Sequence, residues 1–338
     1  MKLLAAFCSL MLCVAPLAAQ QAATAPVQDT FAVVAPSADA AAEHGAQAAH
    51  EPAAGSEDFI TPHISNSRYL DLPYWKAPFH YKVYLPRWEP IHLGPLTLDL
   101  SPTKHVVFLL LAAFLSCAVL ITAAVAHRKH THRAGAPKGF AAGIEALVLY
   151  LRNEVVIPNV GPNGERYVPF ALTLFFFILF ANLLGLMPWG ATATGNISVT
   201  ATLAIITFIV VEIAGMRALG RGYVWTVVYW SHDNPWYMNA PMTLIMTPVE
   251  IIGKFTKPFA LAIRLFANMT AGHIILLALM GLFFSFVGSG GAGAAIAIAP
   301  LFMSVAIMML EIFVAFLQAF IFALLASVFI GQIRTAHH

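Results

Sequence analysis

The fold of this chain is decided by residues 257–275, KPFALAIRLFANMTAGHII, which open a long apolar run and nevertheless carry a charge. Placing the Arg264 guanidinium in hydrocarbon costs at least about 3 kcal/mol on insertion scales. Because this group keeps its charge inside a protein, we expect it only where that charge is used. Asn268 lies at i+4 and therefore shares a helical face with Arg264. The stretch predicts a membrane helix with a functional polar face.

Two more ionisable side chains interrupt the apolar segments that follow. Between residues 258 and 333, only Arg264, His273 and Glu311 are ionisable. Counted from the uncharged loop that joins the last two predicted helices, His273 and Glu311 reach nearly the same depth. We expect them to act as one unit, since a coupled imidazole and carboxylate can titrate on both sides of neutral pH.

A second polar level lies deeper than this pair. By the same count, Arg264, Asn268 and Gln318 fall together there. Glu250 is nearly in phase with Arg264 and about 21 Å closer to the opposite side of the membrane. This layering is typical of an ion path. Two offset partial paths separated by a fixed positive charge would not leak, whereas a continuous pore would.

The composition excludes several classes of protein. The chain is 59% hydrophobic and 10% charged, unlike an ordinary soluble domain, and its net charge is only +2. Basic residues form short clusters beside apolar runs, so nucleic-acid binding has no support. The three cysteines offer neither a disulfide framework nor zinc spacing, so we expect no metal and no cofactor.

The first third of the chain is predicted to be exported. Residues 1–19 resemble a signal peptide, with an uncleaved first helix as the alternative. Residues 20–103 form an N-terminal extension, largely disordered by composition and then rich in proline and aromatic side chains from Phe59. Within it, residues 81–85 and 96–100 are candidates for a pair of strands. Four scattered histidines favour surface positions over a metal site: His63, His80, His92 and His105.

Residues 104–338 form the membrane domain in this interpretation. We expect an all-α polytopic membrane protein whose five transmembrane helices cover residues 105–126, 167–189, 198–214, 247–287 and 296–330. Residues 140–157 are amphipathic and predict one further helix lying on the interface. The fourth span measures about 60 Å, twice the hydrocarbon thickness. We therefore expect the last two helices to be long and tilted.

The positive charges give the topology. Nearly every Lys and Arg that flanks a span falls on one side, while the opposite turns, 188–197 and 287–299, carry none. Lys104 is the exception. The positive-inside bias then places the N-terminus outside and the C-terminus in the cytoplasm, in a multi-pass protein of a bacterial inner (plasma) membrane.

Three motifs carry a resemblance to a known family. RLFANMTAGH at 264–273 and LEIFVAFLQAFIF at 310–322 resemble two helices of subunit a of the F-type ATP synthases, and NLLGLMP at 182–188 resembles a third segment. The resemblance covers about residues 104–334. It implies a stator that is not catalytic alone and forms two half-channels against a rotating c-ring. The implied partners are that ring, the peripheral-stalk b subunits, the remaining ATP synthase subunits and the lipid bilayer.

The resemblance also implies roles for individual residues. Arg264 would face the carboxylates of the ring, with Asn268 and Gln318 near it. The outer half-channel would contain His273, Glu311 and Asn182, and the inner one Glu250. Two departures stand out: some bacterial members exchange the acid and the histidine of the His273–Glu311 pair, and some carry Asp where this chain has Gly185.

Other interpretations remain open at this point. Arg264 could merely extend toward the interface, His273 and Glu311 could form a structural pair, and Asn268 and Gln318 could hold helices together. An ion-coupled secondary transporter would usually show inverted repeats, and an intramembrane protease a nucleophile–base or metal motif. Neither pattern is visible. The choice between H⁺ and Na⁺ stays open, because the binding carboxylate belongs to the ring.

Overall fold

Five helical segments of the computed structural model are long and apolar enough to cross a membrane: Lys104–Val125, Gly164–Gly185, Ile197–Val224, Pro241–Gly288 and Ile298–Thr335. The protein is therefore an all-α polytopic membrane protein, as predicted. The structure describes residues 69–73, 80–86, 91–93, 96–98, 101–131, 139–187, 190, 192–228, 236–288 and 292–335. The predicted signal peptide and the start of the predicted extension lie outside these residues.

The described part of the extension forms two short antiparallel ribbons. Strand β1 (Tyr69–Pro73) pairs with β2 (His80–Tyr84), and β3 (Ile91–Leu93) pairs with β4 (Leu96–Leu98). The predicted pairing of residues 81–85 with 96–100 is therefore wrong. Each of those strands takes a nearer neighbour, for which closing the loop costs less entropy.

The first span and the predicted interfacial segment are both helical. Helix α3 (Lys104–Thr131) is followed by α4 (Phe140–Tyr150), the π-helical segment η1 (Leu151–Val156) and the short α5 (Ile157–Val160). The apolar side of η1 and α5 is buried, and both pack against the end of the last helix. A helix at residues 140–157 is thus present, and its location at the membrane interface stays a prediction.

Helix α6 (Val168–Gly185) is the buried centre of the bundle. It follows the 3-10 turn η2 (Gly164–Tyr167) and packs against α3 and α10. Phe175 is fully buried and meets the ring of Phe316 on α10 edge to face, with 5.6 Å between centroids. Because hydrocarbon supplies no hydrophobic drive between membrane helices, such close packing is what holds α6 in place.

Glycines let the neighbouring helices approach closely. Helix α7 (Ile197–Leu219) begins after the 3-10 turn η3 (Ala193–Gly195), and η4 (Gly220–Thr226) follows it. A Cβ at Gly215 of α7 would lie 2.8 Å from Cγ1 of Ile333 on α10, and one at Gly331 would collide with the backbone oxygen of Asn159. Small residues at such contacts are typical of membrane helix packing.

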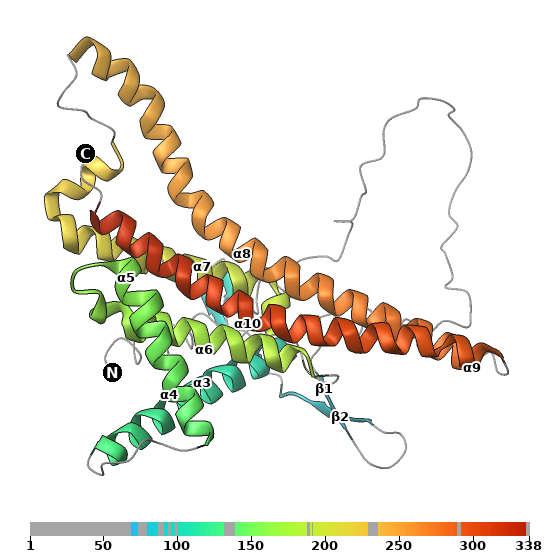
Figure 1. The fold of residues 1–338 in the computed structure, drawn as a ribbon. Helices are drawn as coiled ribbons and strands as arrows, with labels where there is room; N and C mark the ends of the chain where they lie inside the picture. Colours follow the sequence, from blue (N-terminus) through green and yellow to red (C-terminus); the bar gives the residue numbers. More distant parts are fainter. Residues whose placement is uncertain are drawn as a thin grey trace, which may run out of the picture.

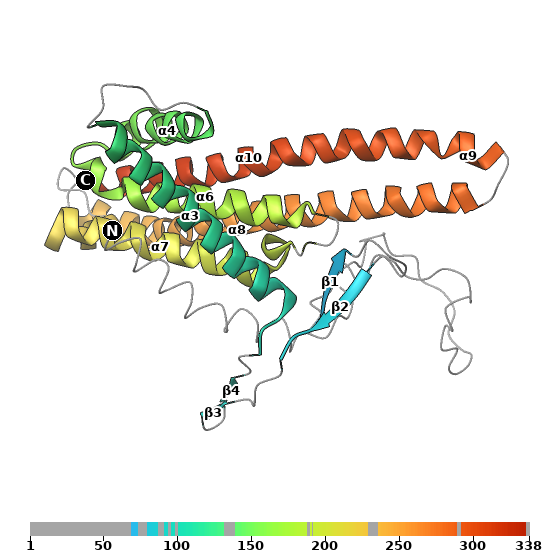
Figure 2. The same ribbon diagram turned by 90° about the horizontal axis from the view of Figure 1, so that it is seen from below.

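The last two long helices form an arm (Figures 1 and 2). Helix α8 (Trp236–Gly288) and α10 (Ile298–Thr335) run antiparallel and are joined through α9 (Ala292–Ile296). The first part of α8 diverges from the other helices (Figure 1). Of its most apolar 18 residues only 6% are buried, against 72% in the α6 span. Helix α8 therefore presents most of its surface to lipid or to a partner.

Helix α8 starts earlier than the predicted residue 247. It has 53 residues and contains Pro241, Pro248 and Pro258. At 1.5 Å per residue it is about 80 Å long, and α10, with 38 residues, is about 57 Å long. Both exceed the hydrocarbon thickness of about 30 Å, so the prediction of two long helices is confirmed.

Candidate functional site

Arg264 lies on the exposed face of α8. Leu261 and Leu265, at i−3 and i+1 of Arg264, are buried beside it, with exposed fractions of 2% and 0%. Asn268, one turn later, is exposed like Arg264, as the i+4 spacing predicted. No described carboxylate forms an ion pair with Arg264, since the two described ion pairs involve other residues. Its charge is thus available to a group from outside the chain.

Two of the three residues predicted at the deeper polar level, Asn268 and Gln318, are in contact. The Asn268 side-chain amide on α8 donates a hydrogen bond of 3.1 Å to Oε1 of Gln318 on α10. Gln318 is buried, with 2% of its surface exposed. The antiparallel count therefore matched these two residues correctly, one turn of helix from Arg264.

Glu311 is buried against α8 without a hydrogen bond. Its exposed fraction is 4%, and neither carboxylate oxygen has a hydrogen-bond partner. The side chain lies over Gly272, where a Cβ would be only 2.7 Å from Oε1 of Glu311. The predicted depth is correct, because Gly272 adjoins His273, but no hydrogen bond joins Glu311 to His273. A buried carboxylate without a partner is rare and is a candidate for function.

Asn182 links three elements beside Glu311. Its Nδ2 donates to the backbone oxygen of Ala315 at 3.3 Å, one turn after Glu311 on α10. Its Oδ1 accepts a hydrogen bond of 2.8 Å from the Thr194 hydroxyl in η3. All of this lies in the interior, since Asn182 and Thr194 are fully buried. Nothing in the sequence motifs singled out Thr194, because its role depends on how the turn folds back onto α6.

The turn after α6 also explains Gly185. The Thr192 hydroxyl donates to the backbone oxygen of Gly185 at 3.3 Å, and a Cβ at Gly185 would lie 3.0 Å from three Thr192 atoms. The space beside Gly185 is therefore already filled by Thr192. A larger side chain, such as the Asp of some members of the resembled family, would need the turn to move.

His105 is a further residue that the sequence did not place correctly. It was expected at the surface, yet it is 8% exposed at the start of α3, and its Nδ1 has no hydrogen-bond partner. Its neighbour Lys104 is 1% exposed. The α3 N-terminus is covered by η3, which a one-dimensional pattern cannot show.

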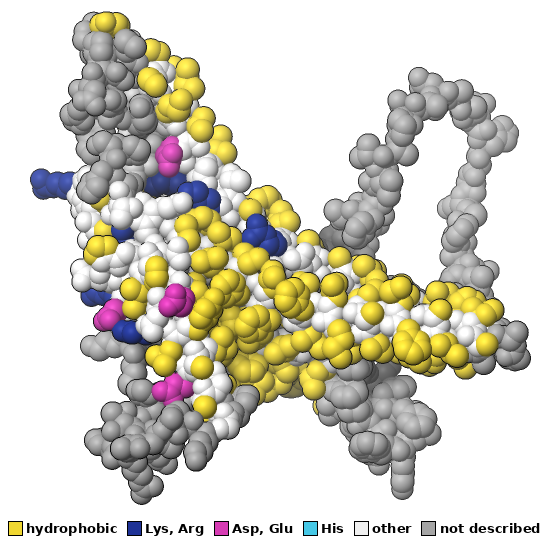
Figure 3. Space-filling view, viewed as in Figure 1, with side chains coloured by type: hydrophobic (Ala, Val, Ile, Leu, Met, Phe, Trp, Pro, Cys, Tyr) yellow, Lys and Arg dark blue, Asp and Glu magenta, His cyan; other side chains and the backbone are white. Residues whose placement is uncertain are grey.

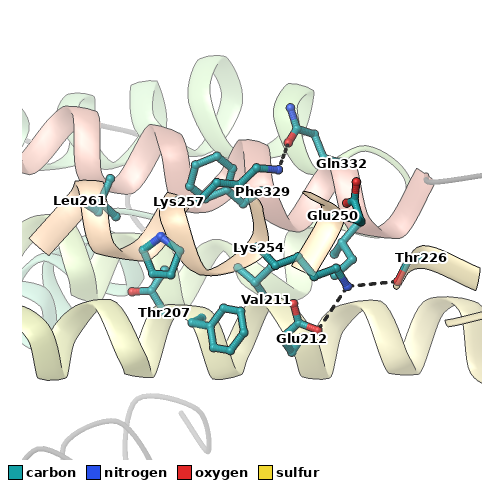
Figure 4. A pocket seen from close by; sticks show the side chains of 13 residues that line it. Thr207, Val211, Glu212, Thr226, Glu250, Lys254, Lys257, Leu261, Phe329 and Gln332 are labelled. Carbon is teal, nitrogen blue, oxygen red and sulfur yellow. Dashed lines mark hydrogen bonds and ion pairs between the residues drawn. The ribbon is translucent and has the colours of Figure 1, made fainter. Parts of the chain in front are cut away.

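A cavity of about 110 Å³ opens between α7, α8 and α10 toward the opposite end from Glu311 (Figure 4). Glu250, the predicted residue of the inner half-channel, lines it. The other polar groups in its wall come from all three helices and η4: Thr207, Glu212, Thr226, Lys254, Lys257 and Gln332. The structure therefore places Glu250 in the wall of this cavity and keeps it apart from the Asn268–Gln318 level.

Lysines bridge the walls of this cavity. Lys254 Nζ lies 3.7 Å from Oε2 of Glu212 and donates to Oγ1 of Thr226 at 3.2 Å. Lys257 donates to Oε1 of Gln332 at 3.3 Å, across to α10. Glu212 and Lys257 thus take part in contacts between helices, because the cavity lies where the helices meet.

Among the described residues, no three side chains of His, Cys, Asp or Glu lie close enough to hold a metal ion. Apart from the Asn268–Gln318 pair, the polar groups of α8 and α10 form two separate clusters, one around Glu311 and one around Glu250. The exposed guanidinium of Arg264 lies between these two positions along α8. This arrangement can accept a proton at either end and can attract an external anion in the middle.

Comparison with known proteins identifies the family of this chain. The family model described as ATP synthase A chain matches residues 106–331. ATP synthase subunit a 2 of Chlorobium luteolum is 43% identical over 328 residues, covering 95% of this chain and 89% of the relative. ATP synthase subunit a of Myxococcus xanthus is 45% identical over 281 residues, covering 80% and 86%. This chain belongs to the ATP synthase A chain family.

Proposed function

We propose that this chain is the proton-carrying stator subunit in the membrane sector of an F-type ATP synthase. Family membership supports the assignment to that complex. In the proposed mechanism, the arm of α8 and α10 faces a ring of small subunits, each with a membrane carboxylate. The chain itself catalyses no reaction. It moves protons to and from the ring, and other subunits of the complex make or hydrolyse ATP.

The exposed, unpaired guanidinium of Arg264 carries this proposal. Large apolar side chains are exposed on the same arm: Ile252, Phe255, Phe259, Ile263, Met309 and Phe313. A permanent charge on an apolar surface needs a counter-ion from outside. A ring carboxylate that arrives at Arg264 would be held in its ionised form, so a proton could not pass directly between the two clusters.

The two clusters supply the two offset half-channels. On one side, Glu311, His273 and Asn182 would deliver protons to the ring. On the other side, the cavity that Glu250 lines would let them leave. The burial of Glu311 without a hydrogen bond supports a role in proton transfer, since a structural carboxylate would normally be paired. We propose a c-ring and peripheral-stalk b subunits as partners.

The distribution of charge supports an orientation. On the face shown in Figure 3, Lys and Arg side chains gather at the end of the molecule where α5 lies, while the far part of the arm is almost wholly apolar. Under the positive-inside bias, the basic end is cytoplasmic. We propose a bacterial inner membrane, with the Glu250 cavity open to the cytoplasm and the Glu311 cluster toward the outside.

The charge of Arg264 provides the decisive test. In inverted vesicles, we expect Arg264→Ala to abolish ATP-driven proton pumping and ATP synthesis while the complex still assembles. Arg264→Lys should fail almost as completely, because an ammonium group can lose its proton in an apolar site and lacks the guanidinium fork. Arg221→Ala, at an exposed arginine in η4, is the matched control and should pump normally. Normal pumping by either Arg264 variant would refute the proposal.

A further inference from the structure

A second cavity, of about 550 Å³, lies at the basic end of the bundle and plays no part in the proposed proton path. It is open on one side and is lined by η2 and the loop before it, by the end of α7 and by the last turn of α10. Three arginines line it, one from each of these three segments: Arg166, Arg217 and Arg334. Its lining contains no acidic side chain. The cavity is thus a concentrated positive site.

Arg334 is fixed in place without being neutralised. Its guanidinium donates to the backbone oxygen of Val160 at 3.0 Å and to that of Pro162 at 2.6 Å. The same group lies 5.4 Å from the centre of the Tyr167 ring. These partners are uncharged, so the hydrogen bonds orient the guanidinium while its full positive charge remains.

Glu165, the acidic residue nearest to Arg166 in the sequence, does not neutralise the positive charge of the cavity. Glu165 precedes Arg166, but its carboxylate pairs with Arg152 at 2.7 Å. Among the described residues, no ion pair involves Arg166, Arg217 or Arg334. Arg166 and Arg217 are both exposed, so they can turn toward a ligand. Three guanidinium groups that line one cavity without a carboxylate are suited to binding a phosphate group.

The position of the cavity identifies the source of the phosphate. Arg166 and Arg334 lie at the ends of the spans Gly164–Gly185 and Ile298–Thr335, and Arg217 lies in the last turn of α7, so all three are near the level where lipid headgroups meet water. The cavity wall also contains apolar side chains, among them Val160, Ala214 and Leu219. We propose that this pocket binds the phosphate of an anionic phospholipid in the leaflet at the basic end. Basic pockets between membrane helices on the cytoplasmic side are suited to such headgroups.

A bound lipid would join the ends of α6, α7 and α10 through one ligand. The bound lipid would reinforce the contact of Arg334 with the loop at residues 160–162. It would also oppose separation of these helices when the ring turns against the subunit. The inference uses the proposed orientation only to name the leaflet, and it is independent of the proposed proton path.

The test uses the whole purified complex in phosphatidylcholine vesicles that contain a minor fraction of deuterated phosphatidylglycerol. After extraction, mass spectrometry measures how much deuterated lipid each complex retains. The variant Arg166→Gln/Arg217→Gln removes two charges and leaves the structural Arg334 in place. Arg221→Gln is the control, since Arg221 is exposed nearby but does not line the cavity. Each lost guanidinium should weaken lipid retention about fivefold, so the double variant should retain about twenty-five-fold less lipid.

Three outcomes would overturn the proposal. The first is equal lipid retention by the double variant and the control. The second is displacement of the lipid by inorganic phosphate, which would identify a site for the free ion. The third is unchanged lipid retention with loss of a neighbouring subunit, which would make the pocket a protein contact. ATP-driven pumping, measured on the same samples, separates this result from a failure of the Arg264 assignment.

Discussion

Glu311 and Arg264 are ionisable groups that form no ion pair within the described chain, but their surroundings differ. Arg264 is exposed on α8 and has room for a group from another subunit. Glu311 is enclosed, and Gly272 makes its position possible by presenting no side chain. The proposed roles follow from this difference, since a buried group can exchange protons with its neighbours while an exposed one can meet a moving partner.

At this scale we expect Gly272→Ala to slow proton transport. The new methyl group would occupy the space of the Glu311 carboxylate and force its flexible side chain to shift, which costs about 1 kcal/mol and corresponds to a roughly fivefold slower flux. ATP-driven proton flux in inverted vesicles measures the effect at matched amounts of the subunit. Gly281→Ala is the control, because nothing lies within 4 Å of a Cβ there. Equal flux in the two variants would contradict the proposed role of Glu311.

At the scale of elements, α10 is the helix on which the bundle converges. It contacts α5, α6, α7 and α8, and its small residues set how near these elements come. The Asn182–Ala315 and Asn268–Gln318 hydrogen bonds both end on it. The position of α10 therefore determines whether the polar residues of the other helices meet.

We expect Gly331→Ala to loosen the end of this helix. A methyl group there would collide with the backbone oxygen of Asn159, which cannot move aside as a flexible side chain can. Overpacking of this kind costs about 1–3 kcal/mol. On heating, the purified complex should lose this subunit at a lower temperature than the parent. Gly143→Ala, in an open position on α4, should leave the dissociation temperature unchanged. No difference between the two variants would show that the tight contact is unimportant.

At the scale of the whole molecule, the assignment of the inner and outer half-channels depends on the orientation of the chain in the membrane. In a Cys117→Ala background, we expect a cysteine at Ala46 to react with a membrane-impermeant thiol reagent in intact cells, and a cysteine at Thr335 to react only after the membrane is opened. N-terminal sequencing of the purified subunit shows whether residues 1–19, with Cys8 and Cys13, are removed. The reverse labelling pattern would exchange the inner and outer paths.

The sequence by itself determined the properties that depend on the length of apolar segments, their periodicity and the distribution of charge along the chain. The spans follow from apolar length, because the bilayer has a fixed thickness. The shared level of Asn268 and Gln318 and the similar depth of His273 and Glu311 follow from counting equal rises outward from one loop. The available charge of Arg264 was also foreseen, since nothing acidic follows it at helical spacing on α8.

Only the tertiary structure decided which faces meet. The partners of Asn182, the burial of His105 and the Glu212–Lys254 bridge depend on how helices are rotated about their axes and which are neighbours. The early start of α8 was missed for a related reason. Pro241 and the tryptophans before it are loop signals in a local pattern. Membrane helices tolerate proline, because neighbouring groups satisfy the backbone hydrogen bonds that it frees.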